Sequence, residues 1–358
     1  MDNKRLKYLD AMRGVAVLMV LMVHSTELSD ITQLKPMISN FIESGVFGVQ
    51  FFFVISSYTL FYTLYHHKKS SVNFYLRRLF RIAPAYYVAI LFYSFHNQTF
   101  GVGELLNFTF THSFSPQYIN SIVPGGWSIG IEMFFYLIVP FLFLYITNLN
   151  KAIYFFSITL IVKLLCYYLI KLPIFLVAAN DGSFMYFWFP NQLPVFAIGF
   201  ILFFCIQKPE MISKQLNLAL LGVAGLVIFS LMTSLQIFSN HIVISVAFAV
   251  VLAFSANVRS YSLLENKILL FIGKISYSAY LWQYATIFLL KEIGFYNFIS
   301  KDISASSYIN FALNFFILFM FTSFTAYISF VTIEKPGQKL GLKIVNRYFS
   351  QHERVVNS

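Results

Sequence analysis

Long apolar segments alternate along the chain with short polar stretches. Each segment approaches the length of about 20 residues that an α-helix needs to cross the hydrocarbon core of a bilayer. Apolar side chains surround each predicted helix on all sides, as lipid-facing helices require. The ten predicted segments cover residues 11–29, 45–65, 82–96, 127–147, 152–172, 185–206, 216–236, 241–256, 268–290 and 308–333.

The composition excludes an ordinary soluble domain. Of the 358 residues, 58% are hydrophobic and 11% are charged, and the mean hydropathy is +0.72. Aromatic residues are abundant, with 44 Phe and 23 Tyr. We therefore predict an all-α fold, a polytopic membrane bundle of about ten transmembrane helices.

The net charge of +11 indicates topology rather than a nucleic-acid partner. If the N-terminus is cytoplasmic and the segments alternate, every Arg falls on the cytoplasmic side, whereas the outer loop 96–125 contains no Lys or Arg. This positive-inside pattern predicts that both termini are cytoplasmic. We expect residues 1–340 to form the transmembrane domain and residues 341–358 a basic cytoplasmic tail.

The two cysteines predict neither a disulfide nor a metal site. Cys166 and Cys205 both lie inside apolar segments, and no metal-ligand spacing is present. The first apolar segment lacks a small-residue cleavage site, so we interpret it as a retained signal anchor.

The first predicted helix contains two basic side chains on nearly the same face. Arg13 and His24 are eleven residues apart, which places them within about 20° of each other and about 16 Å apart along the helix axis. Ionisable residues inside a membrane segment favour a functional role. Two structural alternatives stay open: Arg13 paired with Asp10 at the interface, and His24 hydrogen-bonded to a neighbouring helix.

The fourth segment contains a carboxylate at a depth that matches His24. Glu132 lies about 9 Å below the outer end of this segment, and Tyr136 follows one turn later on the same face. A carboxylate at this depth would orient His24 as a general base, so we predict that these two are catalytic. A pair that only joins two helices is the alternative.

The same segment begins with a G-x-S-x-G pattern, Gly126 to Gly130, which includes Ser128 and a potential support residue, Trp127. In a nucleophile elbow this pattern links a strand to a helix. Here it begins a predicted membrane helix, so we do not predict Ser128 as a nucleophile. We assign at most supporting roles to Trp127, Ser128, Tyr136 and Asp10.

A basic stretch follows the second segment. Arg77, Arg78 and Arg81 have helical spacing, and three guanidinium groups on one short helix would suit a ligand with several phosphates. Retention of positive charge inside the cell and contact with anionic lipids are the alternatives. The choice of Arg where Lys would serve topology equally well favours the ligand.

The order and spacing of six short stretches resemble the acyltransferase 3 family of integral-membrane acyltransferases, which includes O-antigen and peptidoglycan O-acetyltransferases. The resemblance extends over nearly the whole chain. The stretches are Tyr8–Ala16 with the following His24, Gly45–Ser56, Arg78–Pro84, Gly126–Glu132, Gly273–Trp282 and Ile333–Pro336.

This resemblance implies a cytoplasmic acyl-coenzyme A donor and an acceptor hydroxyl on an extracytoplasmic sugar. It implies that Arg13, Arg78 and Arg81 bind the donor and that His24 is essential. It also implies a location in the bacterial inner membrane, acetyl-CoA as a co-substrate rather than a resident cofactor, and membrane lipids as neighbours. Two positions depart from the family pattern: Gln192 and Gln283 stand where many members have Arg and His.

We therefore predict a membrane O-acyltransferase, most simply an acetyltransferase, that acts on a surface polysaccharide or its lipid-linked precursor. His24 would take the proton of the acceptor hydroxyl, or would form an acyl-histidine. A secondary transporter of a small anionic or sugar solute is the alternative, because it too would place His, Glu and Arg inside a helical core. A transporter would usually show an internal repeat and broken helices in corresponding positions, and we find neither in this sequence.

Overall fold

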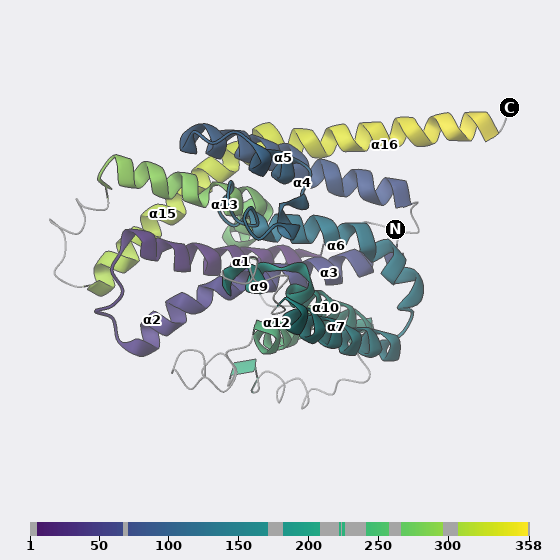
Figure 1. The fold of residues 1–358 in the computed structure, drawn as a ribbon, viewed down its shortest axis with the longest axis horizontal. Coiled ribbons are helices and arrows are strands. Elements are labelled where there is room, and N and C mark those ends of the chain that lie inside the picture. The colour runs from purple at the N-terminus through teal and green to yellow at the C-terminus, as the bar shows by residue number, and fades with distance from the viewer. Residues whose placement is uncertain are drawn as a thin grey trace.

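A computed structural model describes residues 6–66, 71–170, 182–207, 222, 224–225, 241–257, 266–295 and 307–356. Across these ranges the chain is helical and forms no β-strand (Figure 1). The helices are α1 (Lys7–His24), η1 (Ser25–Leu28), α2 (Pro36–Glu43), η2 (Ser44–Phe47), α3 (Gly48–His66), α4 (Ser71–Asn97), α5 (Val102–Phe108), η3 (Thr111–Phe114), α6 (Gly126–Tyr145), α7 (Leu149–Leu169), α9 (Gly182–Phe187), α10 (Phe189–Gln207), α12 (His241–Asn257), α13 (Lys267–Glu292), α15 (Ser307–Ser329), the π-helix η7 (Phe330–Glu334) and α16 (Lys335–Val356).

The protein is a polytopic helical membrane protein, as the apolar segments predict. Within the described ranges, six helical stretches are long and apolar enough to cross a membrane. The predicted segments 82–96 and 268–290 belong to α4 and α13, long helices that contain more polar residues. Segment 241–256 forms α12, a shorter apolar helix, and segment 216–236 lies almost entirely outside the described residues.

The described spanning helices run in two opposite directions. α1 and α13 run parallel, because Gly273 lies against Asp10 near their beginnings and Tyr284 contacts His24 near their ends. The side-chain pairs between neighbours place α4 and α7 in this direction and α3, α6, α10, α12 and α15 in the opposite one. The beginning of α1 and the end of α16 lie at the same end of the bundle (right-hand side of Figure 1), called the inner end below.

Glycines set the closest helix contacts around α1. A Cβ atom on Gly273 would lie 1.7 Å from the carbonyl oxygen of Asp10, and one on Gly45 would lie 2.2 Å from that of Met19. Only glycine permits these approaches, so α13 and the segment before α3 pack directly on the backbone of α1, as small residues allow in membrane bundles. Both glycines belong to the stretches that carry the family resemblance.

The basic stretch is not the separate short helix that the sequence suggested. α4 is one helix of 27 residues, and Arg77, Arg78 and Arg81 lie in its first half, continuous with the apolar segment. This half is packed against protein rather than free in solution: Phe74 is buried and Tyr75 donates a hydrogen bond to the carbonyl of Leu137 in α6. The arginines are thereby held at fixed positions on the bundle.

The last spanning helix continues without a break into the C-terminal helix. α15 passes through the π-helix η7 into α16, which crosses the boundary expected at residues 340/341. α16 packs on α4, where Cβ atoms on Gly337 and Gly341 would lie 2.7 Å from Pro84 and 2.5 Å from Phe80. The π-helix ends at Glu334, which is buried in the bundle.

Short helices cover the outer end of the bundle, opposite the inner end. α2 lies between α1 and α3 and exposes Met37, Ile38 and Phe41. α5 and η3 lie in the predicted outer loop, and the His112 side chain is buried there, with Nε2 3.0 Å from the carbonyl oxygen of Gly126. His112 thus supports the beginning of α6.

Candidate functional site

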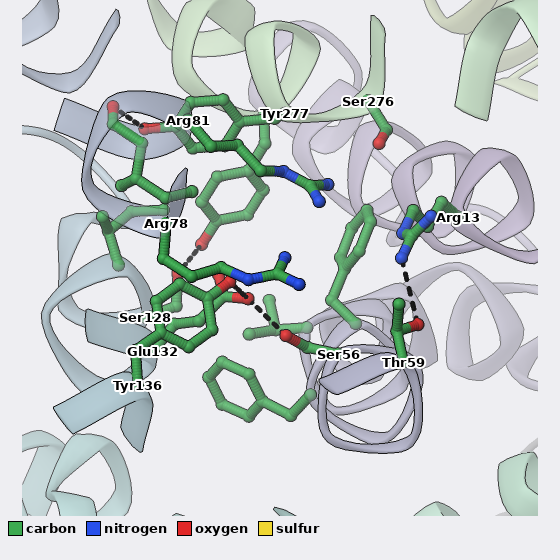
Figure 2. A pocket seen from close by; sticks show the side chains of 16 residues that line it. Arg13, Ser56, Thr59, Arg78, Arg81, Ser128, Glu132, Tyr136, Ser276 and Tyr277 are labelled. Carbon is green, nitrogen blue, oxygen red and sulfur yellow. Dashed lines mark hydrogen bonds between the residues drawn. The ribbon is translucent and has the colours of Figure 1, made fainter. Parts of the chain in front are cut away.

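A cavity inside the bundle contains most of the ionisable residues that the sequence singled out (Figure 2). Its wall is built by α1, α3, α4, α6 and α13, so residues far apart in the sequence meet there. The lining residues are Arg13, Val49, Phe52, Phe53, Ser56, Thr59, Arg78, Arg81, Ile82, Ser128, Ile129, Glu132, Tyr136, Ser276, Tyr277 and Tyr280.

Three guanidinium groups face this cavity. Arg78 and Arg81 extend from α4 toward a space that Arg13 approaches from the opposite side (Figure 2). Arg13 lies 3.1 Å from the Asp10 carboxylate and donates a hydrogen bond to Thr59 at 3.2 Å, so the pairing with Asp10 is confirmed. The structure therefore brings together the three arginines predicted for the donor.

Arg78 and Arg81 keep their hydrogen-bond donors available. Arg78 lies 5.7 Å from the ring centre of Tyr136 as a cation–π contact. Within the described part of the chain, no hydrogen bond from the guanidinium of Arg78 or Arg81 is present, although Glu132 interacts electrostatically with both. Arg77 differs, because its Nε donates to Asn73 and its side chain does not line the cavity.

Glu132 is part of the arginine cavity rather than a partner of His24. Ser56 donates a hydrogen bond of 2.6 Å to Oε1 of Glu132, and the Tyr136 hydroxyl donates to the same oxygen. The expected Glu132–His24 pair is therefore wrong in geometry. The sequence gives the depth of each residue in the membrane but not its position around the bundle. In the structure, α6 packs on α3 and α4, and Glu132 therefore faces these helices.

His24 lies outside this cavity, at the outer end of α1. Its Nδ1 is 2.9 Å from the Tyr284 hydroxyl of α13, and the two rings are 4.6 Å apart. A salt bridge of 2.8 Å between Lys291 and Glu27 joins α13 to η1, the short helix that follows α1. The alternative left open by the sequence, a histidine bonded to a neighbouring helix, is thus observed, with Tyr284 as the partner.

The outer wall of the cavity separates it from His24. Tyr280 contributes to this wall, and the Tyr284 side chain follows one helical turn later, about 6 Å further along α13. The Ser128 hydroxyl donates to the Tyr280 oxygen at 2.9 Å, and the Tyr280 hydroxyl donates to the carbonyl of Gly125 at 3.0 Å. Ser128 lies in the first turn of a helix with no strand before it, so the nucleophile-elbow geometry is absent.

Trp127 supports the outer wall from behind. It is 5% exposed and its ring stacks on Phe187 with centroids 4.6 Å apart. Its edge contacts Phe53, a lining residue, at 6.1 Å. The supporting role that the sequence suggested for Trp127 fits this packing.

Two further openings continue the cavity toward the inner end. One shares Arg13 and Arg81 with it and adds the first residues of α1, Lys274 and Glu334. The other shares Arg78 and Arg81 and is closed on one side by α16. An elongated ligand entering at the inner end would therefore meet the arginines before the outer wall.

Both departures from the family pattern lie in the buried core. Gln192 accepts a hydrogen bond from Gln50 at 3.2 Å and donates to the carbonyl of Tyr186 at 2.7 Å. Gln283 donates to the carbonyl of Tyr280 at 3.1 Å. Neither side chain lines the arginine cavity: Gln192 joins α10 to α3 and α9, whereas the Gln283 bond stays within α13.

Several site residues were not foreseen from the sequence. Ser56, Tyr280 and Tyr284 are uncharged and lie among many other hydroxyl groups, so composition does not distinguish them. Ser56 and Tyr280 do fall within the stretches that resemble the family, which was the available signal. Tyr284 lies two residues beyond such a stretch.

The helical membrane fold, the arginine-lined cavity and the histidine beyond it define a class of integral-membrane proteins with ionisable residues inside the helical core. The family model described as Acyltransferase domain matches residues 6–332, and the chain belongs to this acyltransferase 3 family. It is thus a member of a family of polytopic membrane proteins.

Curated relatives agree with this family. The chain is 26% identical over 388 aligned residues to the O-acetyltransferase OatA of Staphylococcus aureus strain NCTC 8325, and the same values hold for strain COL. The alignment covers 94% of this chain and 57% of each relative, so the chain spans little more than half the length of the proteins it matches. No solved structure matches the chain.

Proposed function

We propose that this protein is a membrane O-acetyltransferase. It would move an acetyl group from cytoplasmic acetyl-CoA to a hydroxyl group of an extracytoplasmic surface polysaccharide or its lipid-linked precursor. The observation that carries the proposal is the pair Arg78 and Arg81. Their guanidinium groups donate no hydrogen bond to any residue that the structure describes, and they face a cavity that opens toward the inner end. The family and the names of the O-acetyltransferase relatives support the transferred group.

The donor would enter with its phosphates toward the arginines. Guanidinium groups bind phosphate oxygens through paired, charge-assisted hydrogen bonds, and two such groups one turn apart on α4 suit a diphosphate. Arg13 would complete the site from α1 while staying paired with Asp10. The thioester at the far end of the donor's extended arm would then reach past Tyr280 toward His24.

His24 would act as the base at the outer end. If Nδ1–H donates to the Tyr284 oxygen, Nε2 is left unprotonated and can accept a proton. Nε2 would take the proton of the acceptor hydroxyl while that oxygen attacks the thioester carbonyl carbon. The carbon–sulfur bond then breaks, and the thiolate of coenzyme A leaves and takes up a proton. Transfer through an acyl-histidine is the other route.

The experiment that tests this function is acetyl transfer from labelled acetyl-CoA in membranes that contain the protein. The wild type should label the surface glycan, and His24→Ala should abolish labelling at unchanged expression. His66→Ala is the control, because His66 is exposed at the end of α3. Normal labelling by His24→Ala would reject the assigned role.

The donor site needs a second variant. Arg78→Ala combined with Arg81→Ala should raise the KM for acetyl-CoA by at least about tenfold, since each charge-assisted hydrogen bond contributes about 1.5–3 kcal/mol. The matched control is Lys339→Ala with Lys343→Ala, which removes two exposed charges from α16. An unchanged KM in the arginine variant would show that Arg78 and Arg81 do not bind the donor and contribute only to membrane topology.

A further inference from the structure

A second groove lies away from the arginine cavity, between α7 and the adjoining ends of α9 and α10. Lys163 and Tyr167 of α7 form one side, and Tyr186, Trp188 and Asn191 contribute to the other. No residue of this groove lines the arginine cavity.

Lys163 is an ionisable side chain inside a membrane-spanning helix. It is the fifteenth residue of α7, about 9 Å from the outer end of that helix. Within the described ranges it has neither a hydrogen bond nor an ion pair, and His241, the nearby titratable group, is also basic. A charge in this position is costly and lies in the half of the membrane where topology does not call for it. An anionic ligand would supply the missing counter-charge.

The other residues of the groove suit a sugar. Tyr186 and Trp188 present aromatic rings, on which sugar rings pack, while a polar edge remains for hydrogen bonds. Asn191 donates to the carbonyl of Tyr186 at 2.9 Å, and this bond fixes its side-chain amide beside the rings. The Tyr186 hydroxyl is fixed in turn by a hydrogen bond of 3.1 Å from Gln50.

The outer surface of α7 suits a hydrocarbon chain. Four side chains of this helix are more than half exposed: Leu164, Leu165, Tyr168 and Leu169. Only 11% of the apolar stretch of α7 is buried inside the protein. Tyr167, which lines the groove, is itself 42% exposed, so the groove borders on this lipid-facing surface. A ligand with an anionic head, a sugar and a long apolar tail matches all three surroundings.

We propose that this groove binds a lipid-linked sugar phosphate, with the phosphate on Lys163, the first sugar against Tyr186 and Trp188, and the apolar chain along α7. The inference rests on the proposed function and names the form in which the acceptor is held. Trp127 connects the two sites, because its ring is 6.2 Å from that of Tyr186 and it precedes Ser128 in the cavity wall.

Binding is tested on the full chain in nanodiscs of neutral phosphatidylcholine. The probe is a short-chain isoprenyl diphosphate that carries N-acetylglucosamine. We expect the probe to bind the wild type, to bind Lys163→Ala at least about tenfold more weakly, and to bind Lys163→Arg nearly as well as the wild type. Lys151→Ala, at the beginning of the same helix, should bind like the wild type. Removing the membrane charge does not threaten folding, because it removes a desolvation cost.

Two results would overturn the inference. One is equal binding of the probe by Lys163→Ala and the wild type. The other is displacement of the probe by phosphatidylglycerol at equal concentration, which would make the groove a site for ordinary anionic lipids.

Acetyl transfer from acetyl-CoA to a water-soluble sugar, measured in parallel, keeps this inference apart from the proposed function. The wild type and Lys151→Ala, whose substitution lies outside the groove, should both carry out that transfer. A wild type without any transfer would reject the function alone and leave the binding result standing.

Discussion

The Tyr284 side chain, which contacts His24, is uncharged, so it orients the imidazole ring through a hydrogen bond and not through an ion pair. The Tyr284 hydroxyl fixes the ring through Nδ1, whereas the Glu27 carboxylate, which interacts electrostatically with the imidazole, is paired with Lys291. His24 is therefore positioned by hydrogen-bond geometry and ring packing rather than by a carboxylate.

Tyr284→Phe should lower kcat for acetyl transfer by about tenfold and leave the KM for acetyl-CoA unchanged. The substitution keeps the ring contact and removes one hydrogen bond, which contributes about 1 kcal/mol or somewhat more. Initial rates at saturating donor measure the effect. Tyr87→Phe is the matched control, since Tyr87 packs against Phe108 far from His24. An unchanged kcat in Tyr284→Phe would exclude a positioning role.

The residue types at the site could be predicted, but their partners could not. Arg13, Arg78, Arg81 and Glu132 were identified because charge inside an apolar segment is rare, and all four line one cavity. Depth along a helix follows from residue number, whereas the direction in which a helix faces depends on its neighbours. That missing coordinate is why Glu132 was matched to His24 and Tyr284 was not found.

At the level of helices, glycine controls where α1 meets its neighbours. Ridges of side chains normally keep helix axes 8–10 Å apart, and glycines allow a closer approach. Gly273 and Gly14 provide this approach between α1 and α13. The contact fixes the register in which Tyr284 reaches His24.

Gly273→Ala should destabilise the protein by more than the 1–3 kcal/mol that overpacking usually costs, because its Cβ would fall 1.7 Å from a backbone oxygen. A lower midpoint of thermal unfolding in detergent measures the effect. Gly101→Ala is the control, since a Cβ there has no neighbour within 4 Å. Equal midpoints for the two variants would contradict the close packing.

The length of α4 is where the prediction of elements failed. The apolar segment predicted from hydropathy begins at residue 82, because charged side chains before it lower the average hydropathy. The helix itself begins at Ser71. The arginines face a cavity and α16 covers the other side, so the polar half is stabilised by tertiary contacts that hydropathy does not record.

For the whole molecule, the class of fold followed from composition, because 58% hydrophobic residues in long segments leave few alternatives. Among the described helices, the directions agree with those that the segment order implies, whereas segment 216–236 lies almost entirely outside the described residues. The charge asymmetry assigns the inner end to the cytoplasm, and that assignment stays a prediction.

Cysteine labelling on intact cells measures the orientation, in a background with Cys166 and Cys205 replaced by Ser. Gln117→Cys in the outer loop should react with a membrane-impermeant maleimide, and Lys343→Cys on α16 should react only after the cells are opened. Both positions are exposed in the structure, so burial does not explain a difference. Labelling of Lys343→Cys on intact cells would reverse the orientation.

Because Arg13 and His24 belong to the same unbroken helix, α1 fixes the distance between them along its axis. The distance between the two levels is set at about 16 Å by the helix rise and does not change unless the helix itself is disrupted. Under the proposed function, every donor anchored by its phosphates places its thioester at one height, whatever acyl group it carries. Discrimination between short and long acyl groups would then belong to the space around Tyr284 rather than to the arginine cavity.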